Sequence, residues 1–215
     1  MESKMAETIS YGAIILSFII FLALLRIKPA KGRVVKDHPI IGKFLNHTHY
    51  SWIWVPMRVY LGFVWLTAGI EKAVNPAWMS GTVIKGFFAN ALGTNASGKP
   101  IIAYGFYRDF ISSIAGSNAT GPFAIAIMLG EVIVGVMLIF GMFTGIAAFI
   151  GAFMNWNFMM AGTASVNPLM FLFSVCLIMA WKTAGYVGLD RWLLPYLGTP
   201  WEEHSKTAVK KISKG

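Results

Sequence analysis

Five long apolar stretches constrain the fold of this chain more than any other feature of its sequence. They are Thr8–Leu25, Ile53–Ala73, Pro122–Met142, Phe143–Gly162 and Pro168–Leu189. A helix rises about 1.5 Å per residue, so about 20 residues cross a hydrocarbon core of about 30 Å. Only 13% of the 215 residues are charged, whereas a soluble domain carries about a quarter. We therefore predict an all-α integral membrane protein.

The last four stretches predict a four-helix transmembrane core over residues 51–189, preceded by one extra N-terminal transmembrane helix. Residues 1–50 hold that first helix and a basic linker, and residues 190–215 form a basic tail. A cleaved signal peptide is the alternative for the first stretch. Its start, Met1 to Glu7, has one Lys and two Glu instead of a basic cluster, so we predict that the helix is not cleaved.

The longest segment between the stretches, residues 71–121, predicts two short interfacial helices. Asn75-Pro76 is a typical helix start, with Asn as the N-cap and Pro in the first turn. Trp78–Leu92 is amphipathic, and Tyr104–Ile114 is rich in aromatic residues. Both are expected to lie on the membrane face or to dip into it.

The charge distribution predicts the orientation. The net charge is +9, and twelve of the 18 Lys and Arg residues lie in two groups of six, Arg26–Lys43 and Lys182–Lys214, which flank apolar stretches. This is the pattern of positive-inside anchoring rather than of nucleic-acid binding. We predict a multi-pass protein of the plasma membrane with its N-terminus outside, its C-terminus in the cytoplasm and residues 71–121 outside.

The residues that the stretches lack exclude several kinds of redox centre. Cys176 is the single cysteine, so the chain can form neither an internal disulfide nor a cysteine-ligated iron–sulfur cluster. None of the four histidines lies in an apolar stretch, which excludes a bis-histidine membrane haem. We therefore expect no haem, iron–sulfur cluster or metal, and any electron transfer would need a bound organic carrier or a partner.

Three of the polar residues inside the apolar stretches are candidate catalytic residues: Glu131, Arg58 and Asn155. A carboxylate at that depth is costly unless it is neutralised, paired or facing a polar cavity. We expect Glu131 to pair with Arg58 and to handle protons beside a redox ligand. Two alternatives remain: a buried pair that only fixes helix register, and an Arg58 that snorkels to the nearby interface.

A second candidate group lies at the outer interface. On the helix that contains Arg58, the residues Trp65 and Lys72 follow at helical spacing on one face. Lys72, with its neighbour Glu71, and Arg108 could draw an anion to the membrane, and Trp65 and Trp78 could hold a flat ring. Ordinary contact with lipid headgroups is the alternative.

Two segments resemble a known family. The segment Arg58–Lys72, RVYLGFVWLTAGIEK, resembles the first core helix of the DoxX/DoxD superfamily. The segment Gly130–Thr144, GEVIVGVMLIFGMFT, resembles its second core helix and turn. Asn155 fits the same pattern, as does Asn167-Pro168, in which we expect Asn167 to be the N-cap of the last span. The resemblance covers roughly residues 51–189.

This resemblance implies a four-helix membrane core and, for the DoxD branch, the large subunit of a thiosulfate:quinone oxidoreductase. Such an enzyme oxidises thiosulfate to tetrathionate, reduces membrane quinone and works with a smaller partner subunit. The resemblance implies functional roles for five polar positions: Arg58, Glu71, Lys72, Glu131 and Asn155. The rival hypothesis is a non-catalytic membrane scaffold or assembly partner of a redox complex. A small-solute transporter is a third and weaker hypothesis, because the sequence has no evident inverted repeat.

Overall fold

The computed structural model describes residues 12, 15–20, 22–23 and 37–199, and these form two compact units, residues 1–37 and 38–215. In the first unit, residues 12, 15–20 and 22–23 are helical, with exposed apolar side chains. The rest of the predicted first span lies outside the described residues. So do the start of the basic linker and residues 200–215 of the tail.

The second unit is helical, and an isolated bridge between Thr94 and Pro100 is its only β pairing among the described residues. The all-α class is thus confirmed. The helices are α2 (Pro39–Asn46), η1 (Thr48–Ile53), α3 (Trp54–Ala73), α4 (Pro76–Met79), α5 (Thr82–Ala91), α6 (Gly105–Ala115), α7 (Thr120–Phe140), α8 (Thr144–Met160), α9 (Asn167–Met179), α10 (Trp181–Ala184) and α11 (Asp190–Tyr196).

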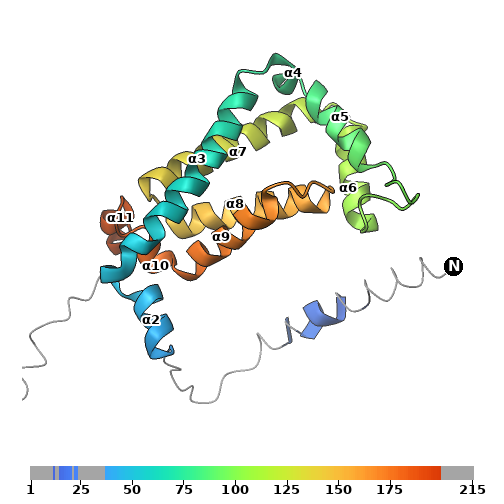
Figure 1. Ribbon diagram of the computed structural model, residues 1–215. Coiled ribbons are helices and arrows are strands. Elements are labelled where there is room, and N and C mark those ends of the chain that lie inside the picture. The colour runs from blue at the N-terminus through green and yellow to red at the C-terminus, as the bar shows by residue number, and fades with distance from the viewer. Residues whose placement is uncertain (1–11, 13–14, 21, 24–36, 200–215) are drawn as a thin grey trace, which may run out of the picture. The chain divides into compact units, whose positions relative to one another are not determined.

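Helices α3 and α7 form the most extensive helix pair of the described chain, and they run antiparallel side by side (Figure 1). Glycines allow this close approach. A Cβ at Gly62 would lie 2.9 Å from the Gly135 carbonyl oxygen, and one at Gly135 would lie 2.6 Å from the Leu66 nitrogen. Two continuous helices, Thr48–Ala73 and Thr120–Phe140, are long and apolar enough to cross a membrane. They coincide with the second and third predicted stretches.

Helices α8 and α9 form the second pair, but they are shorter than the stretches that predicted them. The last stretch was expected to be one helix over Pro168–Leu189, whereas α9 ends at Met179. The chain then turns across the end of the bundle, because the carbonyls of Ala184 and Val187 accept hydrogen bonds from Arg58.

The expected N-cap at Asn167 is also wrong. Val166 takes the N-cap position, and Asn167 is the first helical residue. The Asn167 side chain does not accept a backbone N–H. It donates its amide N–H to the Thr163 carbonyl at 3.0 Å, and this hydrogen bond connects α9 to the loop before it.

The helices between α3 and α7 cover one end of the bundle (Figure 1). The predicted start at Asn75 is confirmed, because its side-chain oxygen accepts hydrogen bonds from the backbone of Ala77 and Trp78. The expected helix over Trp78–Leu92 is interrupted at Gly81, whose φ of 79° places it in the left-handed region. Helices α5 and α6 carry buried aromatic and aliphatic side chains, and so form a packed cap with its own core.

Candidate functional site

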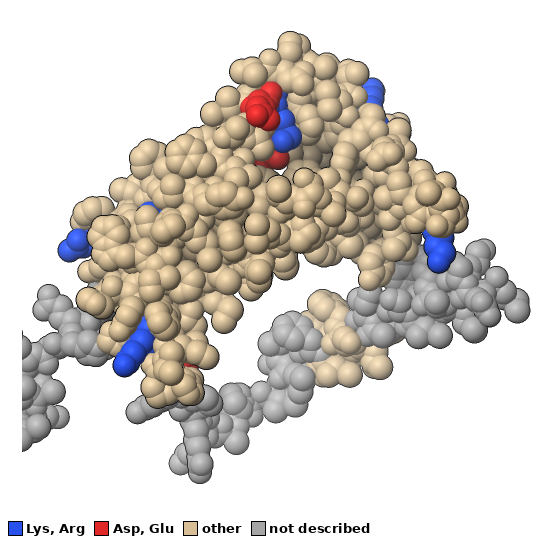
Figure 2. All heavy atoms as spheres, in the orientation of Figure 1, with Lys and Arg blue, Asp and Glu red and all other residues tan. Residues whose placement is uncertain are grey.

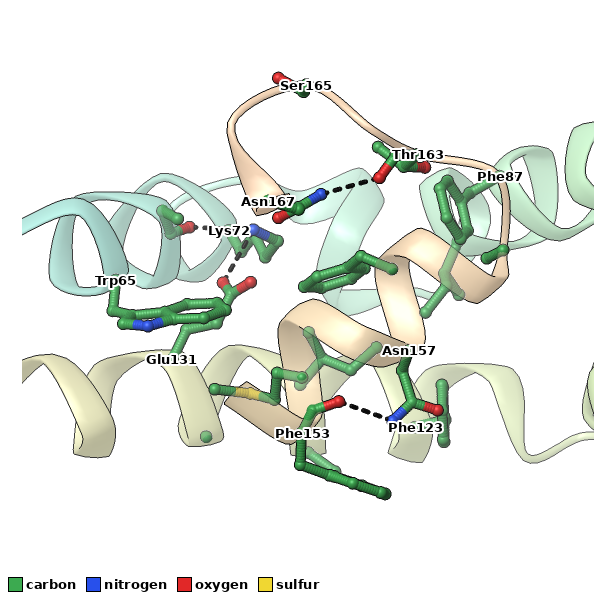
Figure 3. A pocket seen from close by; sticks show the side chains of 18 of the residues that line it. Trp65, Lys72, Phe87, Phe123, Glu131, Phe153, Asn157, Thr163, Ser165 and Asn167 are labelled. Carbon is green, nitrogen blue, oxygen red and sulfur yellow. Dashed lines mark hydrogen bonds and ion pairs between the residues drawn. The ribbon is translucent and has the colours of Figure 1, made fainter. Parts of the chain in front are cut away.

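A cavity of about 660 Å³ lies between the α3–α7 pair and the α8–α9 pair, and the α5–α6 cap closes one end of it. Most of its wall is aromatic or aliphatic. Figure 3 shows Trp65 and Glu131 toward one end and Phe87 toward the other, with the loop that carries Thr163 and Ser165 passing over the space. Its volume and lining are typical of a site for a small apolar ligand.

One ion pair lies in the wall of this cavity. Lys72 Nζ lies 2.7 Å from Glu131 Oε2, and the Glu131 side chain is only 2% exposed, against 21% for Lys72. Lys72 Nζ also donates to the Ala68 carbonyl at 3.4 Å and lies 5.0 Å from the centre of the Trp78 ring. Figure 2 shows acidic and basic side chains side by side on this face, with further basic side chains toward its edges.

Close helix packing sets the register of this pair. A Cβ at Gly69 would lie 2.9 Å from the Val132 nitrogen and 3.2 Å from Glu131 Cβ, so the two backbones touch at this level. Lys72 is one helical turn beyond Gly69 on the same face of α3. Its long side chain therefore reaches Glu131 without leaving the cavity wall.

The expected pairing of Arg58 with Glu131 is wrong. Arg58 lies about four helical turns, roughly 21 Å, before Lys72 on α3. It is buried at the other end of the bundle, where its Nη atoms donate to the carbonyls of Ala184 at 3.0 Å and Val187 at 2.9 Å. The snorkelling alternative is wrong as well, because only 3% of the residue is exposed.

Asp190 belongs to this second polar cluster, and the sequence did not indicate it. Its carboxylate is fully buried and accepts backbone N–H bonds from Phe143 at 2.5 Å and Thr144 at 2.9 Å. It thereby caps the start of α8 from a distant part of the chain, and it also attracts Arg58. Arg58 and Asp190 hold helix ends together and do not line the cavity beside Glu131, so we assign this cluster a structural role.

Asn155 is buried on α8 but does not line the cavity. Gly151, one turn earlier on the same face, packs against the Trp65 indole nitrogen and Val134. Because α7 and α8 run antiparallel, Asn155 lies near the level of Glu131. Among the described residues, neither amide atom of Asn155 has a hydrogen-bond partner, nor has the Trp65 indole nitrogen.

The predicted site residues fall into two groups, those that line the cavity and those that do not. Trp65, Lys72, Trp78 and Glu131 line the cavity, whereas Arg58, Glu71, Arg108 and Asn155 do not. Trp78 is fixed by a hydrogen bond from its indole nitrogen to the Ala124 carbonyl at 2.9 Å. Arg108 donates to the Leu92 carbonyl at 2.6 Å, and so braces the cap.

Asn157 is a lining residue that sequence reasoning did not place in the site, and its contact is Tyr107 of the aromatic-rich segment Tyr104–Ile114. The Tyr107 hydroxyl donates to Asn157, with its backbone oxygen at 3.0 Å and its side-chain oxygen at 3.2 Å. Burial raises the pKa of Tyr107, so its hydroxyl stays neutral. This contact joins α6 to α8 across the cavity wall.

No metal site accompanies the cavity in the part of the chain that the structure describes, where no three His, Cys, Asp or Glu side chains gather. Comparisons of the chain with protein-family models, with curated proteins and with solved structures each find no match.

Proposed function

We propose that this chain is a multi-pass protein of the plasma membrane with a four-helix core and an additional N-terminal span. The long apolar helices Thr48–Ala73 and Thr120–Phe140 support this placement. The two basic groups of the sequence assign the α5–α6 cap to the outside and α10–α11 to the cytoplasmic side. The cavity then lies toward the outer half of the membrane, within reach of lipid-soluble molecules.

We propose further that the chain is the membrane subunit of a quinone-linked oxidoreductase, with the quinone ring in the cavity. The observation that carries this proposal is an apolar, aromatic-lined space of about 660 Å³ whose one charged contact is the Lys72–Glu131 pair. A quinone head has flat apolar faces and two carbonyl oxygens, which match such a lining with a single polar corner.

Four lining residues have definite tasks in this proposal. The faces of Trp65 and Trp78 hold the ring, and Lys72 donates a hydrogen bond to a carbonyl oxygen. Glu131 delivers a proton to the same oxygen only when the ring is reduced, and the buried surroundings strengthen both interactions. A bound quinone would supply the redox chemistry by accepting two electrons and two protons.

The proposed electron donor is thiosulfate or a similar small sulfur anion at the outer face. Two thiosulfate ions join through a new S–S bond to give tetrathionate, and the two electrons released reduce one quinone with the uptake of two protons. Arg108 and Lys72 supply positive charge near this face, and a smaller partner subunit is expected to complete the donor site. The resemblance to the DoxD branch supports this part of the proposal.

The test uses the full chain purified from membranes together with its expected partner subunit, in a mild detergent that preserves the complex. We expect quinone in its lipid extract and thiosulfate-dependent reduction of a quinone analogue. Ala126→Phe should fill the cavity and lower both, whereas Leu129→Phe, on the same helix but outside the cavity lining, should leave both unchanged. Equal quinone content in the two variants would contradict the cavity as the site. Bound quinone without any reduction would favour the non-catalytic scaffold.

A further inference from the structure

The charge balance of the cavity restricts which ligands it can hold. Three titratable side chains line its described wall: Lys72 from α3, Glu131 from α7 and Tyr107 from α6. The parts of α4, α5, α8 and α9 that line it add no titratable group. Tyr107 already donates its hydroxyl to Asn157. Lys72 and Glu131 cancel one another, so the lining is neutral.

We propose that the cavity also binds acidic ring compounds, which carry one anionic oxygen on an apolar body, and takes up one proton with each anion. Lys72 moves from Glu131 to the ligand oxygen, and Glu131 accepts the proton. This inference rests on the proposed quinone site and adds a ligand class to it.

The contacts of Lys72 allow this exchange. Its ammonium group is held by the Ala68 carbonyl and the face of Trp78 as well as by Glu131, so it keeps two of its three contacts when the carboxylate is released. It is the more exposed partner of the pair and can turn toward a ligand. Glu131 has no such freedom, because it is almost fully buried.

The low dielectric of the cavity makes the proton necessary. An anion beside an intact Lys72–Glu131 pair would leave one uncompensated negative charge among aromatic side chains, which is strongly unfavourable. Released from Lys72, the Glu131 carboxylate is itself a buried charge without a partner. One proton on Glu131 restores neutrality, with the Lys72 ammonium paired to the ligand anion.

Two matched probes test this inference on the purified full chain in lipid nanodiscs. Naphthoquinone is neutral, and hydroxynaphthoquinone is an anion near neutral pH. Binding is followed by quenching of tryptophan fluorescence, and proton uptake by a pH indicator in weak buffer, with empty nanodiscs as the blank. We expect the anion to bind with uptake of one proton and to lose affinity about tenfold for each unit of rising pH. Naphthoquinone should bind without proton uptake and with an affinity that does not depend on pH.

Two variants locate the groups involved. Glu131→Gln should bind hydroxynaphthoquinone without proton uptake and independently of pH. Lys72→Met should weaken binding of the anion at least tenfold and that of naphthoquinone much less. Lys85→Met, on the exposed face of α5 and away from the cavity lining, should match the unmodified chain.

The outcomes separate this inference from the proposed function. If naphthoquinone binds and the anion does not, or if the anion binds without proton uptake, the inference is overturned and the quinone site stands. If neither probe binds, both are overturned. The proton count is measured on the unmodified chain, so the inference stays testable even if a variant fails to fold.

Discussion

At the residue scale, the partner of Glu131 decides what its removal should do. The carboxylate lies 2.7 Å from Lys72 in a nearly uncharged cavity wall. Losing one partner of a buried pair leaves the other charge uncompensated. Lys72 keeps its contacts with Ala68 and Trp78 and some exposure to solvent, which lowers that cost below the value for a fully buried ion.

We expect Glu131→Gln to lower the free energy of unfolding by about 2 kcal/mol, seen as a lower melting temperature in detergent. Glu131→Gln/Lys72→Met should recover much of this loss, because it removes both charges. Glu131→Gln/Arg58→Met is the matched control and should be less stable than either single variant. Recovery by Arg58→Met would show that Arg58, and not Lys72, compensates the carboxylate.

Asp190 gives a second prediction at this scale. Asp190→Asn keeps the size of the side chain but weakens the two hydrogen bonds to Phe143 and Thr144 and removes the charge near Arg58. We expect a loss of about 1–2 kcal/mol in the free energy of unfolding, measured by thermal melting. Asp109→Asn, at an exposed position on α6, should melt like the unmodified chain. Equal melting of the two variants would contradict the capping role.

At the scale of elements, the contact between α3 and α7 sets the register of the site. Gly135→Ala would place a Cβ 2.6 Å from the Leu66 nitrogen. Because this is a contact with backbone atoms, it can be relieved only if the two helices move apart. We expect a loss of about 1–3 kcal/mol together with weaker quinone binding, because Lys72 and Glu131 would move apart.

Gly86→Ala is the control for that change. It lies in helix α5, and its Cβ would meet nothing within 4 Å. It should raise stability by about 0.5–1 kcal/mol, since Ala favours a helix over Gly. Thermal melting and the binding of a quinone analogue compare the two variants. A Gly135→Ala protein as stable as Gly86→Ala would contradict direct backbone contact.

The sequence predicted elements better than their contacts. Apolar length alone located α3 and α7, and Asn75-Pro76 located the start of α4. Helical spacing put Arg58 and Lys72 on one face of α3, but it carries no information on where α7 lies beside that face. The approach of Gly69 to Val132 fixes that register, so the choice of Lys72 as the partner became visible only in the folded chain.

The end of α9 shows the same limit. Apolar composition continues to Leu189, so hydropathy predicted one long helix. The hydrogen bonds of Arg58 to Ala184 and Val187 require a turn there instead. The role of Asp190 could not be predicted from the sequence either, because its hydrogen-bond partners lie 46 and 47 residues earlier in the chain.

At the scale of the whole molecule, the α5–α6 cap covers one end of the helical bundle and α10–α11 lie at the other, and the proposed orientation assigns one end to each side of the membrane. Reporter fusions after Gly32 and Gly215 should both report cytoplasm. A fusion near Gly98, in the exposed turn before α6, should report the exterior. A cytoplasmic signal at Gly98 would reverse the orientation and place the cavity toward the wrong face for an external sulfur donor.

The composition of the whole chain also predicts its spectrum. Without a histidine in the apolar stretches or a second cysteine, purified protein should show no haem Soret band and no stoichiometric iron, zinc or copper. Absorption spectroscopy and elemental analysis check this. A tightly held metal would point first to His38, His47 and His49, in the segment of the chain before α3.

The cap that Asp190 places on α8 has a consequence for the order of synthesis. Thr144 leaves the ribosome 46 residues before the carboxylate that binds its backbone. At about 5–20 residues per second, the start of α8 waits roughly 2–9 s for its cap. During that interval the hairpin of α7 and α8 has free backbone N–H groups at its turn. Helix α11, the last that the structure describes, thus completes a turn made 46 residues earlier, and a nascent chain that stalls before Asp190 would carry an unfinished bundle.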